Sequence, residues 1–272
     1  MKTSVMRRAR RFSLLLTALA GMLLSQLSQA EQIEAHPELG AVFKTMGVTG
    51  TFVLFDVAND VQRVYSPSRA QVRYFPASTF KIPNSLIGLE TGAVKDLNEV
   101  FRYDGKPRML KAWEQDMTLA EAIRASNVPV YQEIARRVGL HSMASWVDKL
   151  DYGNRQIGKM VDQFWLGGPL KISALEQTRF LAKLAQKKLP FSEQTIDAVH
   201  AITLHEQTET YQIHAKTGWS NATKPGIGWW VGWVKRGDQL YPFALNIDIR
   251  RDEDAALRVP LARQLLSRLG VI

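Results

Sequence analysis

The sequence predicts an α+β protein in which both ends of the chain build one central antiparallel sheet, flanked by helices and joined to a mostly helical subdomain. Three observations predict this fold. A β-branched and aromatic run occupies residues 51–57, helical patterns fill the middle of the chain, about residues 78–210, and three strand-like runs with a closing amphipathic helix end it. Because strands at both ends need partners, we expect them to share one sheet.

The first thirty residues have the pattern of a secretory signal peptide. Five basic residues and no acid fall within the first eleven positions, an apolar stretch runs from Phe12 to Leu24, and Ser28-Gln29-Ala30 offers the small residues that a signal peptidase accepts. The apolar stretch is shorter than the about 20 residues of a membrane span, which disfavours an N-terminal anchor. We therefore expect cleavage before Glu31, a periplasmic location, and a single folded unit over residues 31–272.

The charge of the chain depends on this leader. The sequence carries 35 basic and 26 acidic residues, a formal net charge of +9, but without the five basic residues of the leader the remainder carries only +4. A net charge of +4 is too small to indicate a nucleic-acid-binding surface. No later apolar run is long enough for a membrane span. We expect neither nucleic acid nor a membrane as partner, and a monomer or a homodimer.

Cysteine is absent from the sequence, which excludes disulfides, a thiolate nucleophile and cysteine-ligated metals. The five histidines are scattered and form no His-x-x-x-His pair, so we expect no metal site.

The elements follow from local patterns, in chain order. Residues 62–65 should pair with the first strand, 51–57, across a turn. Helices are predicted at 78–91, 118–125, 130–138, 143–150, 174–186 and 192–204. Three strands follow at 211–217, 227–234 and 240–249, the last two joined by a hairpin turn at 235–238, and leucines four residues apart place a helix at 255–269. The strand with Trp229, Trp230 and Trp233 is rich enough for core or interface, and we expect core.

The strongest chemical signal is Ser78-Thr79-Phe80-Lys81 at a predicted helix start. A spacing of three puts the serine hydroxyl and the lysine amine on one helical face, within reach of each other. Serine needs an adjacent base, and lysine serves only if burial lowers its pKa from about 10.4. The structural alternative is a capping serine beside a solvated lysine, and Pro83 requires an irregular first turn.

Three further motifs lie downstream, each with a structural alternative. Lys216-Thr217-Gly218 on a strand suits an anionic ligand, or is an ordinary edge strand. Ser126-Asn127-Val128 connects two helices, and Asn127 could simply cap the second. Tyr152-Gly153-Asn154 could be a plain turn. The combination of Ser-x-x-Lys, a central serine motif and Lys-Thr-Gly in this order is typical of serine β-lactamases and penicillin-binding proteins.

In these motifs the chain resembles the class D serine β-lactamases, the oxacillinase family, over essentially its whole length after the leader. Ser-x-Val replaces the Ser-Asp-Asn of class A, and residues 161–171 contain no glutamate to activate water, but do contain Phe164-Trp165-Leu166. The resemblance implies the β-lactamase and transpeptidase fold as one catalytic unit, a β-lactam as small-molecule substrate, hydrolysis through an acyl-serine, and neither a metal nor an organic cofactor.

The resemblance also implies residue roles. Ser78 is the nucleophile, and carbon dioxide or bicarbonate carboxylates Lys81, which becomes the general base. Val128, Trp165 and Leu166 support the carbamate, and the backbone N–H groups of Ser78 and Trp219 form the oxyanion hole. Ser126 and Lys216 relay a proton to the leaving nitrogen. The residues expected to bind substrate are Thr217, Gly218, Arg258, Trp113, Tyr152 and Asn154.

Some of these assignments leave alternatives. Arg250, Arg251 and Arg258 all follow the last strand, and Leu257-Arg258 matches the family best as the carboxylate ligand. Trp113 resembles an aromatic residue at the rim of the site, or is a packing residue. A β-lactam sensor that is acylated without turnover and a cell-wall D,D-peptidase are the alternative functions.

Overall fold

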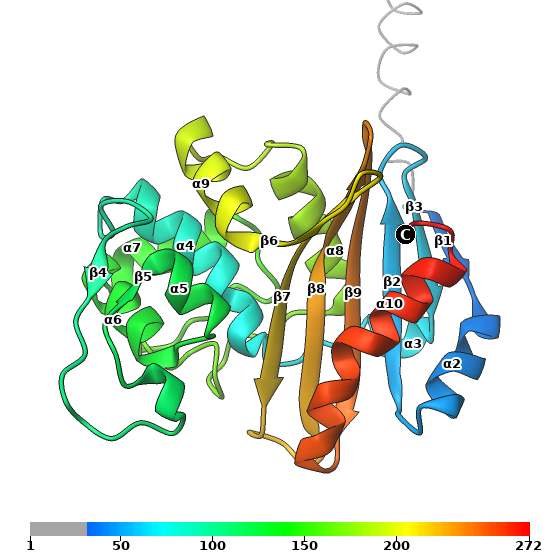
Figure 1. Ribbon diagram of the computed structural model, residues 1–272, viewed down its shortest axis with the longest axis horizontal. Helices are drawn as coiled ribbons and strands as arrows, with labels where there is room; N and C mark the ends of the chain where they lie inside the picture. The colour runs from blue at the N-terminus through cyan, green and yellow to red at the C-terminus, as the bar shows by residue number, and fades with distance from the viewer. Residues whose placement is uncertain (1–31) are drawn as a thin grey trace, which may run out of the picture. The chain divides into compact units, whose positions relative to one another are not determined.

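The structure, a computed structural model, describes residues 32–272, so the predicted signal peptide and its cleavage point lie outside the described residues. Residues Ile33–Ile272 form one compact unit. Its centre is a seven-stranded sheet in the order β1-β3-β2-β9-β8-β7-β6 (Figure 1). The strands are β1 Gln32–Ala35, β2 Gly50–Asp56, β3 Val61–Tyr65, β6 Leu204–Gln207, β7 Gln212–Ser220, β8 Gly226–Arg236 and β9 Gln239–Ile249.

Both ends of the chain meet in this sheet. Strand β2 pairs antiparallel with β3 on one side and with β9 on the other, with Phe52 opposite Leu245. From β9 the sheet continues through β8 and β7 to β6, again antiparallel. The predicted fold class is therefore confirmed, including the sheet shared between the two ends.

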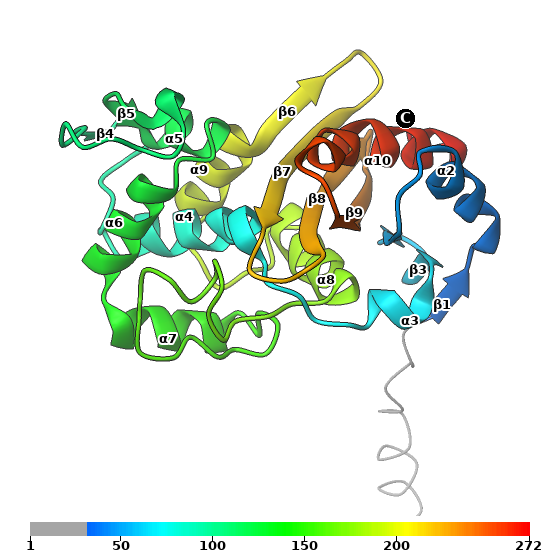
Figure 2. The same cartoon turned by 90° about the horizontal axis from the view of Figure 1, so that it is seen from below.

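The interior strands are apolar because they are covered on both faces. The side chains of Trp229, Trp230 and Trp233 on β8 are at most 1% exposed, which confirms their prediction as core residues. Helices α2 (Gly40–Thr45) and α10 (Arg258–Arg268) lie on one face of the sheet and α8 (Ala174–Ala185) on the other, as Figure 2 shows.

The mostly helical region lies beside the β6–β7 side of the sheet (Figure 1). It contains α4 Lys81–Glu90, α5 Leu119–Arg124, α6 Val128–Val138, α7 Leu140–Lys149 and α9 Glu193–Thr203, with a small sheet of β4 Val100–Phe101 and β5 Met117–Thr118. Shorter elements are α3 Pro67–Ala70 and the 3-10 turns η1 Pro37–Leu39, η2 Ala77–Phe80, η3 Lys111–Trp113 and η4 Asp252–Leu257. Within residues 32–272, no helix has the length and apolar character to cross a membrane.

The predicted helices and strands match these elements to within a few residues, with two differences at helix starts. The helix predicted from Ser78 begins with the 3-10 turn η2, which puts Pro83 in the first turn of α4, where its missing N–H is tolerated. The helix predicted at 255–269 likewise begins with the 3-10 turn η4.

Candidate active site

The predicted nucleophile lies on η2, directly before α4. The Ser78 Oγ atom accepts a hydrogen bond from Lys81 Nζ at 2.9 Å. The preceding residue, Ala77, has φ 48°, a left-handed conformation that is costly for a residue with a Cβ atom. Its N–H donates to the carbonyl of Trp165 at 3.0 Å, which helps to hold the strained turn.

Lys81 is completely buried, and its environment is apolar. Burial, with a further contribution from the charge of Lys216, holds the pKa of Lys81 well below its usual value. Its Nζ atom lies 5.1 Å from the centroid of the Tyr131 ring, and Phe80 lies beside it in the chain. Burial thus favours the uncharged amine of Lys81, which is the form that can act as a nucleophile or a base.

The indole of Trp165 belongs to the same apolar cluster. Its ring stacks on Phe80 with centroids 5.5 Å apart, and Leu166 packs against the same core. The Nε1–H group of Trp165 is buried and has no hydrogen-bond partner among the described residues. Because an unpaired buried donor is costly, this N–H is available to an acceptor that the described residues do not supply.

The serine of the second motif lies on the loop before α6. Ser126 has φ 54°, and Asn127 accepts from Val130 N at 3.1 Å, so the sequence alternative that Asn127 caps this helix is confirmed. Val128 is the half-buried first residue of α6. Trp113 is 7% exposed and donates its indole N–H to Ala125 O at 2.9 Å, directly before Ser126. In this position Trp113 supports the serine loop.

Lys216 reaches this loop from β7. Its Nζ atom donates to Ser126 Oγ at 2.9 Å and lies 3.0 Å from the Thr217 carbonyl and 3.3 Å from Thr217 Oγ1. Burial, with a smaller contribution from the charge of Arg258, lowers the pKa of Lys216 to about 7. A lysine with this pKa can both give and take a proton near neutral pH.

Arg258 is the first residue of α10. Its guanidinium donates to Gly218 O at 2.6 Å and to Ala255 O at 2.5 Å. Burial lowers its pKa to about 10. Arg250 instead donates to Thr49 Oγ1, and Arg251 pairs with Asp254. Of the three candidate arginines, Arg258 is the one bonded to the Lys-Thr-Gly strand.

Strand β7 touches the nucleophile turn at Gly218. A Cβ atom there would lie 3.0 Å from Pro76 O and 3.0 Å from a Thr79 methyl group, so the close approach requires glycine. Ser78 stands between these two contact residues, and Trp219 directly follows Gly218. The backbone N–H groups expected to form the oxyanion hole therefore come from segments in direct contact.

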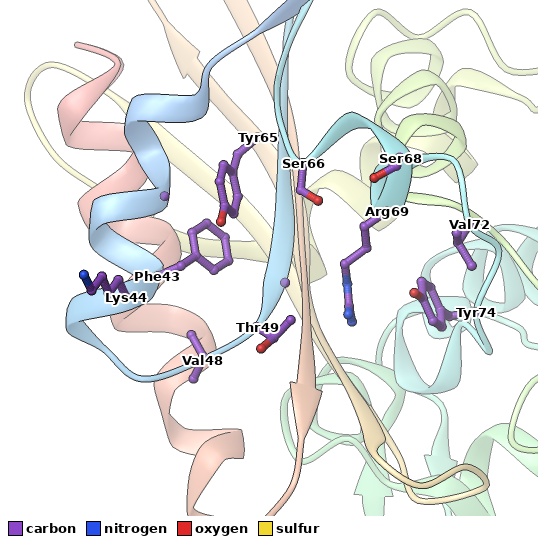
Figure 3. Close-up of a pocket in the computed structure, with 12 residues that line it drawn as sticks. Phe43, Lys44, Val48, Thr49, Tyr65, Ser66, Ser68, Arg69, Val72 and Tyr74 are labelled. Atoms are coloured by element: carbon purple, nitrogen blue, oxygen red, sulfur yellow. The ribbon is translucent and has the colours of Figure 1, made fainter.

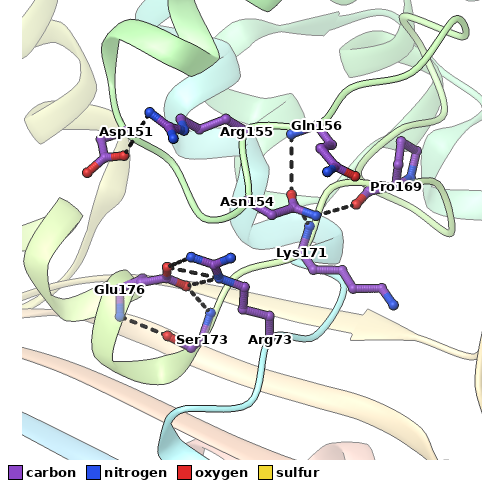
Figure 4. A network of polar contacts seen from close by, with 9 residues as sticks. All are labelled: Arg73, Asp151, Asn154, Arg155, Gln156, Pro169, Lys171, Ser173 and Glu176. Atoms are coloured by element: carbon purple, nitrogen blue, oxygen red, sulfur yellow. Dashed lines mark hydrogen bonds and ion pairs between the residues drawn. The ribbon is translucent and has the colours of Figure 1, made fainter.

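The structure gives Tyr152 and Asn154 a different position from the substrate contact expected of them. Tyr152 is completely buried, edge to face with Phe80 and Phe180. The amide of Asn154 is bonded to Pro169 O at 2.8 Å and Lys171 N at 3.0 Å (Figure 4). Gly153 has φ 58°, and a Cβ atom there would meet Lys171 O at 2.1 Å. This correction makes the motif a turn that anchors the loop after Trp165.

Sequence reasoning missed two residues that hold the nucleophile turn. Trp229, expected only as core, donates its indole N–H to Phe75 O at 2.9 Å. Gln177 on α8 donates to Thr79 Oγ1 at 2.8 Å, and this hydroxyl donates to Pro76 O at 2.7 Å. A buried indole usually finds an acceptor, but nothing in the sequence names the acceptor.

A separate hollow of about 600 Å³ opens between α2, α3 and the start of β2 (Figure 3). Of its two cationic residues, Lys44 and Arg69, the arginine pairs with Asp248 at 2.7 Å and donates to Asn246 Oδ1. The hollow contains none of the residues predicted for the site. Across residues 32–272 there is also no cluster of three or more histidine or acidic side chains that could hold a metal.

Comparison with known proteins agrees with this arrangement. Residues 50–267 match the family described as the penicillin-binding protein transpeptidase domain. The chain is 42% identical to β-lactamase OXA-5 of Pseudomonas aeruginosa, over 89% of this chain and 92% of that protein. It is 40% identical to β-lactamase OXA-48 of Klebsiella pneumoniae, over 89% and 92%. A solved class D β-lactamase from Nostoc superposes with a TM-score of 0.85 at 39% identity, covering 87% of this chain and all of that one.

The sheet, the helical region and the serine–lysine pair thus define a protein of the penicillin-binding transpeptidase fold. Within that fold the chain belongs to the class D β-lactamases, as its motifs predicted, and its relatives are β-lactam hydrolases.

Proposed function

We propose that this enzyme hydrolyses penicillin-type β-lactams through an acyl-Ser78 intermediate, with carboxylated Lys81 as general base in both half-reactions. The observation that carries the proposal is a fully buried Lys81 bonded to Ser78. It is supported by the N–H of Trp165, whose ring stacks on the neighbouring Phe80 and which has no hydrogen-bond partner within residues 32–272. A carbamate on Lys81 supplies an anionic base where the loop of residues 161–171 offers no glutamate, and its one carboxylate, that of Asp162, is paired with Arg136.

Acylation begins with attack of Ser78 Oγ on the lactam carbonyl carbon. Ser78 loses its proton to the modified side chain of residue 81, 2.9 Å away before modification. The N–H groups of Ser78 and Trp219 hold the negative charge that develops on the carbonyl oxygen. The C–N bond then breaks, and the lactam nitrogen takes a proton from Ser126 Oγ. Lys216 Nζ, 2.9 Å away, gives a proton back to Ser126 Oγ.

Substrate binding rests on two residues at strand β7, the hydroxyl of Thr217 and the guanidinium of Arg258. Thr217 and Arg258 hold the ring carboxylate, and the guanidinium can make two parallel hydrogen bonds to it. Gly218 lets the substrate lie against the strand, and Trp113 keeps the Ser126 loop in place. Val128 and Leu166 limit water near residue 81. Deacylation uses one water molecule, which residue 81 deprotonates for attack on the ester carbonyl.

The test is steady-state hydrolysis of benzylpenicillin with and without bicarbonate. We expect turnover that falls when bicarbonate is removed and recovers when it is added. Lys81→Ala should lose turnover by several orders of magnitude. A stoichiometric burst without turnover would support a β-lactam sensor, and unchanged activity of Lys81→Ala would refute the base assignment.

The leader belongs to the same proposal. We propose that residues 1–30 are removed on export to the periplasm and that residues 31–272 are the single catalytic unit. N-terminal sequencing of the protein from a periplasmic extract should begin at Glu31, and an intact N-terminus there would contradict it.

A further inference from the structure

A small pocket of about 190 Å³ lies beside Ala215, Lys216 and Thr217 of strand β7, just past the residues of this strand that pair with β6. Lys216 and Thr217 line it from the side of the active site. The other residues that define its chemistry are Arg124 at the end of α5, Ile202 at the end of α9, His205 on β6 and Trp230 on β8. The pocket therefore shares a wall with the catalytic cluster.

The order of groups along β7 indicates what the pocket faces. A strand advances about 3.3 Å per residue, so the oxyanion donor at Trp219 and the carboxylate ligand Thr217 are about 7 Å apart along it. The pocket continues in the same direction, past Lys216 to Ala215. We consider a substrate whose lactam carbonyl lies at Trp219 and whose ring carboxylate lies at Thr217. The ring atom next to its carboxylate-bearing carbon then faces this pocket.

The lining of the pocket is basic. Arg124 is exposed on the last turn of α5, and the acidic residue one turn earlier, Glu121, accepts hydrogen bonds from Thr118 in the capping box of that helix. The His205 ring lies edge to face with Trp230, with centroids 5.7 Å apart. None of the described residues that line the pocket is acidic. A volume of 190 Å³ holds about six water-sized groups, which suits a short side chain.

We propose that this pocket is a subsite for the substituent on the ring atom next to the carboxylate-bearing carbon, and that Arg124 and His205 select short anionic or hydrogen-bond-accepting substituents there. In a cephalosporin this is the C3 substituent. In penicillins the corresponding ring atom carries two methyl groups and no polar chain. The inference rests on the proposed function, because that function sets the orientation of the substrate along β7.

The experiment uses three cephalosporins with the same C7 side chain and a 2-carboxyethyl, propyl or 2-ammonioethyl group at C3. We expect kcat/KM to decrease in that order, with about a tenfold ratio between the anionic and cationic substrates. Arg124→Glu should reverse the order, and Arg124→Gln should lower the ratio to a value between those of the wild type and Arg124→Glu, because His205 and Lys216 remain in the lining. Arg236→Glu makes the same charge change at the far end of β8 and should keep the wild-type ratio.

Benzylpenicillin separates the two proposals. If the wild-type enzyme hydrolyses benzylpenicillin but shows the same anionic-to-cationic ratio as Arg124→Glu, the subsite is overturned and the proposed function stands. If benzylpenicillin is not hydrolysed, the proposed function itself fails. Because Arg124 is exposed, the thermal melts of its variants should match that of the wild type. A folded Arg124→Glu protein with the same anionic-to-cationic ratio as the wild type would contradict the assignment.

Discussion

The indole N–H of Trp165 is a buried donor that has no hydrogen-bond partner within residues 32–272. Trp165→Phe keeps an aromatic ring against Phe80 and removes only this donor. We expect the variant to hold its carbamate less tightly, with turnover down by about tenfold to a hundredfold and partly restored at high bicarbonate. Carbon-13 NMR of protein in labelled bicarbonate measures occupancy directly, and a wild-type carbamate signal in Trp165→Phe would contradict this role.

Lys216 makes the activity of the site depend on pH. Its pKa of about 7 means that the protonated amine, the proton donor, is lost as pH rises above neutrality, so kcat/KM should fall on the alkaline side. Burial is the larger cause of this pKa and the charge of Arg258 the smaller. Arg258→Met should therefore move the alkaline limb to higher pH, in addition to weakening binding. A pH profile of benzylpenicillin hydrolysis tests this, and an unmoved limb would exclude the coupling.

The motif residues could be assigned from sequence where spacing alone sets geometry. Ser78 and Lys81 lie three apart, so any helical turn brings them together, as their 2.9 Å contact illustrates. Tyr152 was misassigned because burial depends on partners far away in the chain, here Phe80 and Phe180. No local pattern reveals such contacts.

The nucleophile turn is an element held from several sides. The N–H of Trp229 bonds Phe75 O, and Gln177 bonds Thr79. Trp229→Phe leaves the Phe75 carbonyl without this donor, at a cost of about 1–3 kcal/mol in the free energy of unfolding. Because the turn carries Ser78 N–H, we also expect about a tenfold slower acylation burst.

Trp233→Phe is the matched control for this change. Trp233 is equally buried on the same strand but stacks on His214, with centroids 4.4 Å apart. It should lose stability without a slower burst. Equal bursts in the two variants would show that the Trp229 bond is only structural.

Long elements could be predicted, whereas several of the shortest or most exposed ones could not. Strand β8 is a continuous apolar run and helix α8 has an apolar face at helical spacing, so both stand out in the sequence. Strand β6 is exposed at the edge of the sheet, and α3 has four residues, so neither presents a repeating apolar face. Their existence depends on tertiary contacts.

At the scale of the whole molecule, the buried His214 makes the free energy of unfolding depend on pH. Burial, as the main cause, lowers the pKa of His214 to about 4, whereas an unfolded chain protonates histidine near pH 6.5. Between these values the unfolded state binds the extra proton, so stability falls as pH decreases, by up to about 1.4 kcal/mol per pH unit.

His214→Phe keeps a ring against Trp233 and removes the proton site, so its stability should change less between pH 7 and pH 4.5. Urea unfolding at the two pH values measures the difference. His141→Gln, at an exposed histidine on α7, should retain the wild-type dependence. An equally steep dependence in His214→Phe would contradict the assignment.

The pairing of β2 with β9 has a consequence for biogenesis. Phe52 meets Leu245, almost two hundred positions later in the chain, so a ribosome must deliver nearly the whole polypeptide before the sheet can close. Contacts of such sequence separation make folding slow. A chain that stops before Gln239 leaves the apolar strands β2 and β8 without their shared neighbour, and such open edges invite aggregation. C-terminal truncation is therefore expected to abolish the folded enzyme as a whole, even though Ser78, Lys81 and Lys216 would all still be present.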